Sequence, residues 1–249
     1  MKEFFLIPLR EMKHRKIRSF LTLIGIIIGI AAIVSLITLG QGLQNAIAGQ
    51  FAALGNDKIF ITAKGSALTP GLSIDAVKIT EDDLETVKHT AGVRRAAGMI
   101  YSTGRIEFND HVRYFFVSGL PEDPDDRALI GEANSYTIGT GRPIEKGDKF
   151  KVVLGHQYRT KGLFDAELSL GDKILIQDQE FKVVGFMDKI GSPPDDQSIL
   201  MPIDAYQEIF GSGKELGLLV AQIDSGETLE KVSDNLKKDL RKSRDVDED

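Results

Sequence analysis

Residues 20–39, FLTLIGIIIGIAAIVSLITL, form a mostly apolar run that directly follows a basic cluster. No charged side chain occurs in residues 20–56, a stretch of 37 residues. A helix rises about 1.5 Å per residue, so twenty residues span roughly 30 Å, the thickness of the hydrocarbon core of a bilayer. Inside hydrocarbon each backbone amide needs a partner within its own segment. The sequence therefore predicts a transmembrane helix over 17–40.

A cleaved signal peptide and a buried core helix are the two alternatives to a membrane helix for this run. Ala46-Ile47-Ala48 resembles a signal-peptide cleavage site, but the apolar region of a signal peptide is typically 7–15 residues long and this run is longer. A buried helix of a soluble core rarely continues this far without a charge. A retained membrane helix is the favoured interpretation.

The flanking charges predict the orientation of the helix. Residues 1–18 contain six basic and two acidic side chains, a net charge of +4, whereas the whole chain has a net charge of −6. Positively charged flanks stay in the cytoplasm. We therefore predict a cytoplasmic amphipathic segment over 1–16, an acidic extracytoplasmic domain, and a basic anchor for membrane lipid at Lys13, Arg15, Lys16 and Arg18. The acidic balance argues against nucleic acid as a partner.

Helical spacing of apolar residues continues beyond Leu39, so we predict a helical stalk over 41–56. Gly40 and Gly42 lower the helix propensity there and leave a break open. Within the membrane part, Gly25 and Gly29 are four residues apart. Small residues at this spacing allow another helix to approach closely, so we predict that these two glycines form a helix-packing face.

The region after the stalk has the patterns of a mixed fold. Strands are expected at 58–64, 96–108, 111–119, 151–155, 173–177, 180–188, 198–202 and 216–223. Helices are expected after Thr80 and at 156–164, 203–210 and 227–242, with exposed loops at 121–127 and 190–197. We predict an α+β fold, in which a split α+β subdomain (57–104 and 205–249) contains an inserted β-rich subdomain (105–204).

The sequence contains no known catalytic motif. The absence of cysteine excludes disulfides and thiolate metal sites. Gly211-Ser212-Gly213-Lys214 approaches a phosphate-binding loop, but Glu215 replaces the required hydroxyl. Asp245-x-Asp247-x-Asp249 is interpreted as a solvated acidic run rather than a calcium loop. The histidines, His14, His89, His111 and His156, lack metal-ligand spacing. We predict no catalytic, cofactor-binding or metal-binding residue in this chain.

A series of short motifs resembles MacB/FtsX-type ABC transporter permeases along the whole chain. The amino-terminal motifs are Arg18-Ser19-Phe20-Leu21-Thr22, Gly25-Ile26, Ile28-Gly29-Ile30-Ala31-Ala32 and Leu54-Gly55. The later ones are Gly92-Val93, Val117-Ser118-Gly119, Gly141-Arg142, Val153-Leu154-Gly155, Leu163-Phe164, Leu170-Gly171-Asp172, Phe181-x-Val183-Val184-Gly185 and Met201-Pro202.

The resemblance implies a permease with four membrane helices and an extracytoplasmic domain between the first two. It implies an ABC ATPase subunit as partner, which would hold ATP and Mg, together with a second permease copy and an extracytoplasmic adaptor. ATP-driven motion would be relayed to the outer domain for export or envelope signalling.

The sequence stops before the second, third and fourth membrane helices that the resemblance implies. We therefore expect an amino-terminal fragment, the product of a truncated gene, or one half of a split permease. The alternative function is a signal-anchored extracytoplasmic binding or scaffold protein. A third candidate, an anchored hydrolase, is disfavoured by the missing nucleophile and metal patterns.

Overall fold

The computed structural model describes residues 16–54, 57–63 and 78–245. The chain divides into two compact units, Met1–Ala53 and Leu54–Asp249. The described part of the first unit belongs to a single helix, α2 (Lys16–Leu54), which is 39 residues long. This helix is continuous through Gly40 and Gly42, so the break that these glycines left open is not present.

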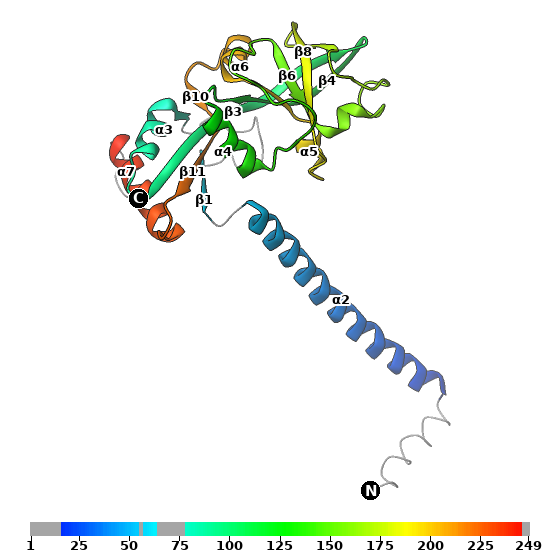
Figure 1. The fold of residues 1–249 in the computed structure, drawn as a ribbon. Coiled ribbons are helices and arrows are strands. Elements are labelled where there is room, and N and C mark those ends of the chain that lie inside the picture. Colours follow the sequence, from blue (N-terminus) through cyan, green and yellow to red (C-terminus); the bar gives the residue numbers. More distant parts are fainter. Residues whose placement is uncertain (1–15, 55–56, 64–77, 246–249) are drawn as a thin grey trace. The chain divides into compact units, whose positions relative to one another are not determined.

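The second unit, here called the outer domain, is a mixed α/β structure (Figure 1). In chain order its elements are β1 (Lys58–Thr62), β2 (Ile79–Thr80), α3 (Glu81–Lys88), β3 (Val93–Phe108), β4 (His111–Leu120), α4 (Pro124–Asn134), β5 (Ile138–Gly141), β6 (Lys151–Leu154), the 3₁₀ turn η1 (His156–Arg159), β7 (Lys173–Ile176), β8 (Gln179–Met187), α5 (Pro193–Asp196), β9 (Ile199–Pro202), α6 (Ile203–Phe210), β10 (Glu215–Leu216), β11 (Leu218–Ile223) and α7 (Leu229–Ser243). The predicted α+β fold with one amino-terminal apolar helix is confirmed.

Strand β3 is shared by two parts of the outer domain. Its first half pairs antiparallel with β11, which in turn pairs with β1. Its second half pairs with β4, and its end also pairs with β7. Figure 1 shows β3 running from the region of α3 and α7 to the region of β4, β6 and β8. The predicted boundary between the subdomains, at 104/105, falls inside this strand, and the predicted division stays a prediction.

Six strands, one of which is the second half of β3, close into a barrel. The pairing runs from β3 to β4, β9, β6, β8 and β7, and from β7 back to β3. The β4–β9 and β6–β8 pairs are parallel and the other four are antiparallel. Closure leaves no free edge within the ring, and a small barrel of this kind is filled by side chains.

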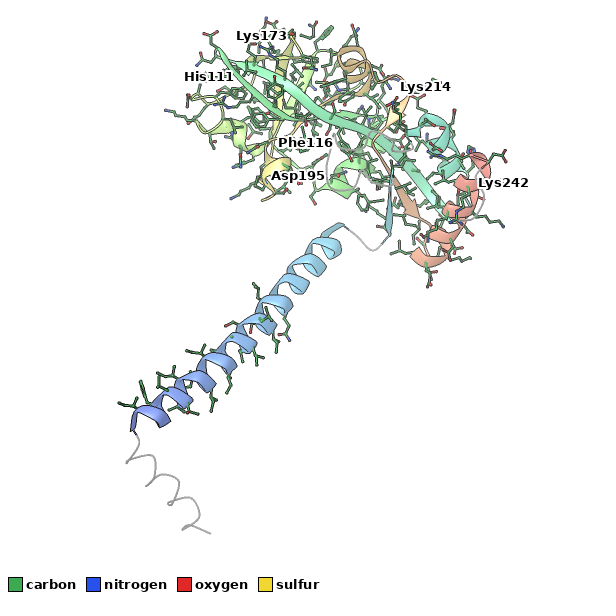
Figure 2. The ribbon with its side chains drawn as sticks, turned by 180° about the vertical axis from the view of Figure 1, so that it is seen from behind. His111, Phe116, Lys173, Asp195, Lys214 and Lys242 are labelled. Carbon is green, nitrogen blue, oxygen red and sulfur yellow. The ribbon has the colours of Figure 1, made fainter. Side chains whose placement is uncertain are left out.

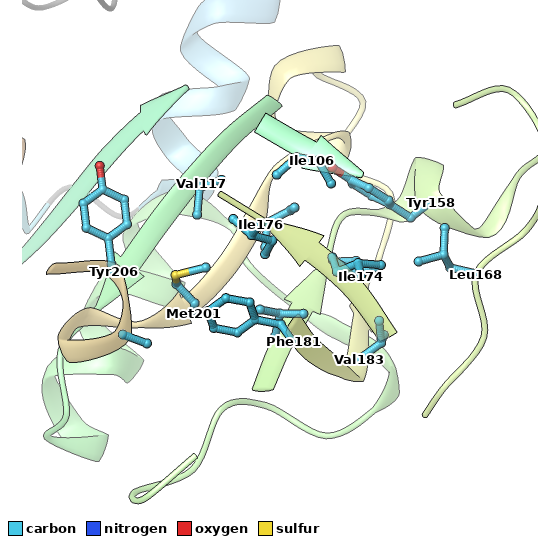
Figure 3. Packing of buried hydrophobic residues seen from close by; sticks show 14 of the residues in the cluster. Ile106, Val117, Tyr158, Leu168, Ile174, Ile176, Phe181, Val183, Met201 and Tyr206 are labelled. Carbon is cyan, nitrogen blue, oxygen red and sulfur yellow. The ribbon is translucent and has the colours of Figure 1, made fainter. Parts of the chain in front are cut away.

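Large apolar side chains fill the barrel (Figure 3). Tyr158, Phe164, Phe181, Ile106 and Ile176 are fully buried members of this cluster. The ring of Tyr158 makes an edge-to-face contact with Phe115 and a tilted contact with Phe164. The barrel interior is therefore a packed core.

Two further cores lie on opposite faces of the β1–β11–β3 sheet. Helices α3 and α7 cover one face, where Val87, Leu219 and Val232 are buried. Helix α4 covers the other face through Leu129 and Ile130, and this core extends onto the outer surface of β6, β8 and β9. The sheet is thus covered by helices on both sides.

Local sequence signals explain most element boundaries. Asn109 and Asp110 both have positive φ angles, 49° and 60°, as a two-residue hairpin turn of type I′ requires. Thr80 caps α3 in a reciprocal capping box with Asp83. The predicted exposed loop at 121–127 is wrong in its second half, because Asp123 caps α4 and Pro124 occupies its first turn.

The other predicted loop and one predicted helix also differ from the structure. The segment 190–197 contains the single turn α5, and the Asp196 carboxylate accepts hydrogen bonds from the backbone N–H groups of Ile190 and Gly191. The predicted helix at 156–164 is limited to the 3₁₀ turn η1.

Candidate functional site

Helix α2 contains one stretch that is long and apolar enough to cross a membrane. It covers Phe20–Gly42, 23 residues with a mean hydropathy of 2.8, and none of it is buried in the described structure. Ile33 and Leu36, for example, are 61% and 72% exposed. Each branched side chain of this size favours an apolar environment by about 1.5–3 kcal/mol. The stretch therefore requires lipid or other apolar helices around it.

The predicted packing face lies within this stretch. Gly25 and Gly29 are one helical turn apart, and a Cβ atom added at either position meets no heavy atom within 4 Å. The described chain itself thus leaves this face uncovered. Of the predicted basic anchor, Lys13 and Arg15 lie outside the described residues. Lys16 and Arg18 lie in the first turn of α2, and only their backbone is described.

The first residues of the outer domain are held by a set of polar contacts that we call the junction network. It consists of Asp57, Lys58, Arg94, Glu132 and Gln222. The Gln222 side chain donates through Nε2 to Asp57 Oδ2 (2.6 Å) and accepts at Oε1 from Arg94 Nη2 (2.7 Å). Lys58 Nζ donates to Asp57 Oδ1 (3.2 Å) and lies 3.6 Å from Glu132 Oε2.

Burial and backbone geometry define the network further. Gln222 is 9% exposed and the Lys58 side chain 7%. The hydrogen bond from Gln222 is the main cause of a lowered pKa of Asp57, which burial opposes and Lys58 reinforces. The register between β3 and β11 shifts between Gln222 and Ile223, so Arg94 is the extra residue of a bulge. Bulges re-aim side chains, and here Arg94 reaches Gln222.

The sequence analysis missed this network. Gln222 is the one polar residue in β11, LLVAQI, and that pattern was the available signal. A buried amide needs hydrogen-bond partners, but the sequence does not say which residues supply them.

A shallow apolar groove of about 190 Å³ lies on the outer surface of the barrel. It is lined by Thr103, Tyr114, Phe115, Phe116, Pro193, Pro194 and Gln197. Figure 2 shows Phe116 on this surface, with Asp195 marking the position of α5. The ring of Tyr114, which is 66% exposed, lies at this groove.

The chemical motifs considered in the sequence have structural roles. Gly211 has a φ of +64° and ends α6, so the segment that resembled a phosphate loop is a helix terminus. His89 caps the carboxyl end of α3, and His111 lies 3.2 Å from Asp165 at the hairpin tip. Among the described residues, no group of three or more His, Cys, Asp or Glu side chains could hold a metal ion.

Comparison with known proteins assigns the fold to a family. Residues 19–239 match the MacB-like periplasmic core domain. The chain belongs to this family. An uncharacterised ABC transporter permease of Methanocaldococcus jannaschii is 35% identical over 234 residues, 94% of this chain and 57% of that protein. The pyoverdine export ATP-binding/permease protein PvdT of Pseudomonas putida is 26% identical over 227 residues, 88% of this chain and 33% of that protein.

A solved structure has the same fold. The periplasmic region of MacB from Actinobacillus actinomycetemcomitans superimposes with a TM-score of 0.59 and 14% identity, covering 77% of this chain and 86% of that chain. The family match and the permease relative from Methanocaldococcus jannaschii confirm the predicted resemblance to MacB/FtsX-type permeases. The MacB-like chain described here spans between a third and three-fifths of the length of the two relatives it was compared with.

Proposed function

We propose that this chain is the membrane-anchored outer part of a MacB-type ABC transporter permease. In this proposal α2 crosses the cell membrane with its amino terminus in the cytoplasm, and the outer domain lies outside. A partner ATPase binds ATP and Mg, and its motion is relayed through α2 to the outer domain for export or envelope signalling.

One observation carries the proposal. A 39-residue helix, of which 23 residues can span a bilayer, continues without a break to Leu54, and the match to the MacB-like periplasmic core domain covers most of this helix together with the outer domain. At 1.5 Å per residue, the 12 helical residues beyond Gly42 add about 18 Å of rigid rod. A continuous helix transmits displacement or rotation, which a flexible linker of the same length would absorb.

The packed barrel also favours a relay over a carrier. A carrier domain holds its cargo in a cavity of several hundred Å³, whereas the interior of this barrel is filled by Tyr158, Phe164 and Phe181. Motion of such a body moves it as a whole, because a packed core deforms little.

Topology is tested by cysteine accessibility, because the chain has no cysteine of its own. Lys173→Cys, at an exposed position on the barrel, should react with a membrane-impermeant maleimide in intact cells. Lys2→Cys should react only after lysis. The reverse pattern contradicts the proposed orientation, and reaction of neither position contradicts the exposure of the outer domain.

The partner is tested by affinity purification from solubilised membranes of the native host. An ABC ATPase is expected to copurify, and its ATP hydrolysis should depend on the presence of this chain. Recovery of the chain as a monomer without an ATPase supports the alternative, a signal-anchored binding or scaffold protein, and contradicts the permease proposal.

The glycine face of α2 offers a test of assembly within the membrane. Gly25→Leu or Gly29→Leu should reduce recovery of the complex severalfold if another helix packs there, because leucine prevents close approach. Ile28→Leu, in the same stretch, is the matched control and should leave recovery unchanged. Equal recovery of all three variants shows that the glycine face contacts lipid.

A further inference from the structure

The amino-terminal strand of the outer domain lies at the edge of its sheet. In the described structure β1 pairs only with β11, through Lys58–Gln222 to Thr62–Leu218. The amino end of an edge strand is where a sheet frays first, because it has a partner on one side only. In the proposed relay, any displacement arriving along the chain from α2 acts on this end.

Backbone hydrogen bonds to β11 alone hold the amino end of β1 only weakly. Ile223 N donates to Asp57 O (2.9 Å), which makes Asp57 and Ile223 a hydrogen-bonded pair. Alternation along an antiparallel ladder then places the next bonded pairs at Ile59–Ala221 and Ile61–Leu219. A force at Asp57 would open these pairs in sequence, since each opening exposes the next.

The junction network connects this end across the sheet. The Asp57 carboxylate binds the Gln222 amide of β11, and that amide binds Arg94 of β3. Lys58 adds a link to Glu132 of α4. Three strands and one helix are therefore joined near Asp57, close to the amino-terminal end of the outer domain. The link to β3 is the important one, because β3 continues into the barrel.

We propose that the Asp57–Gln222–Arg94 row is the mechanical anchor that transfers motion of α2 to β3, and hence to the barrel. This deepens the proposed function and rests on it. Without the row, motion at Asp57 separates β1 from β11. With the row, it is carried directly to the strand that forms part of the barrel wall. Gln222 and Arg94 are positioning residues in this scheme.

The variants separate anchoring from general stability. Gln222→Met keeps the volume of the side chain and removes both of its hydrogen bonds. Asp57→Ala removes the acceptor, whereas Asp57→Asn retains an oxygen for Gln222 and serves as the conservative rescue. Asp148→Asn, in a buried ion-pair cluster inside the domain, is the matched control that weakens the domain without touching the row.

The local readout is hydrogen exchange in the membrane-embedded chain. The amides of Ile59 and Ile61 should exchange about tenfold faster in Gln222→Met and Asp57→Ala, because opening of β1 no longer breaks the row. Asp57→Asn should remain close to the unsubstituted protein, and Asp148→Asn should not change these two amides selectively. Unchanged exchange in Gln222→Met overturns the inference.

The functional readout uses a fluorescent label on Lys173→Cys in the complex with its ATPase. ATP should change the fluorescence of the label in the protein that carries only Lys173→Cys. This change should fall at least severalfold when Gln222→Met is added, while ATP hydrolysis continues. If the ATP-dependent change of the label signal is the same in Gln222→Met, the anchor proposal is wrong, whereas the proposed relay is not contradicted. If the protein that carries only the labelled Lys173→Cys does not respond to ATP, the proposed function itself is contradicted.

Discussion

The contacts of Asp148 predict how its replacement changes the stability of the outer domain. Its side chain is 5% exposed and accepts four hydrogen bonds from three residues. Arg142 donates through Nη1 (2.5 Å) and Nη2 (3.2 Å), Lys151 donates through Nζ (2.6 Å), and Glu145 donates its backbone N–H (3.0 Å). Asp148→Asn keeps the shape of the side chain and removes its charge.

The expected loss follows from these contacts. A hydrogen bond to a charged group contributes about 1.5–3 kcal/mol, and breaking a fully buried pair costs about 3–5 kcal/mol. Arg142 and Lys151 are 33% and 40% exposed, so water can solvate the cations that lose their partner. We therefore expect Asp148→Asn to lower the free energy of unfolding by about 2–3 kcal/mol.

The same contacts predict a pH dependence. Burial raises the pKa of Asp148, but the hydrogen bonds from Arg142 and Lys151 outweigh it and hold the pKa well below its usual range. A carboxyl whose pKa is lower in the folded state stabilises the protein above the pKa of the unfolded state, near 3.9, and loses this contribution as the pH falls further. Asp148→Asn should therefore destabilise the protein fully at pH 7 and progressively less below about pH 4.

Tyrosine fluorescence during urea unfolding measures this effect. All five tyrosines lie in the outer domain and the chain has no tryptophan, so the signal excludes α2. Asp178→Asn is the matched control, because Asp178 also pairs with an arginine, Arg105 (2.6 Å), but is 82% exposed. A surface pair contributes little, and the control should scarcely move the midpoint. Equal shifts for the two variants, or an effect of Asp148→Asn that is independent of pH, would refute the reasoning.

Three further predictions concern the barrel and the helix. The hydroxyl of Tyr158 is buried without a hydrogen-bond partner among the described residues. Tyr158→Phe should therefore raise the free energy of unfolding by about 1 kcal/mol in the same urea assay. A loss of stability would contradict this and indicate that the hydroxyl has a partner. Gly141 has a φ of +80° and its added Cβ would lie 2.3 Å from the carbonyl oxygen of Val184, so Gly141→Ala should cost about 3 kcal/mol. Gly226→Ala, at a φ of +95° with open space around it, should cost about 1 kcal/mol, and similar costs would disprove the steric argument. Insertion of Gly-Gly-Gly at Ala48 should abolish the ATP-dependent response of the outer domain while ATP hydrolysis persists, since glycines interrupt the rigid helix; a preserved response removes the relay.

The sequence predicted elements whose signals are local. The hairpin at Asn109-Asp110 and the capped start of α3 at Thr80 are examples, because turn and cap preferences act within four residues. The missed helix α4 also had a local signal, in which Asp123 precedes Pro124 and two acidic residues. The acidic composition of that stretch was interpreted as a solvated loop instead.

The sequence could not predict features that depend on distant pairings. Barrel closure rests on β7, a strand of four residues that pairs with β3 some seventy residues earlier. The junction network likewise joins Asp57 to Gln222, 165 positions apart. Neither pattern is visible in a window of neighbouring residues, because the partner is selected by the folded sheet.

The uninterrupted course of β3 limits how this domain can vary. One face of the strand passes from Ala96, under α3 and α7, to Ile100 and Ile106 inside the barrel. Side chains alternate between the two faces of a strand. Adding or deleting one residue between these points would therefore move the side chains that fill one of the two cores to the opposite face of β3. Length changes in this family should therefore occur at hairpin tips and helix ends, and a chimaera that joins the barrel of one relative to the helical layer of another must inherit β3 from a single parent.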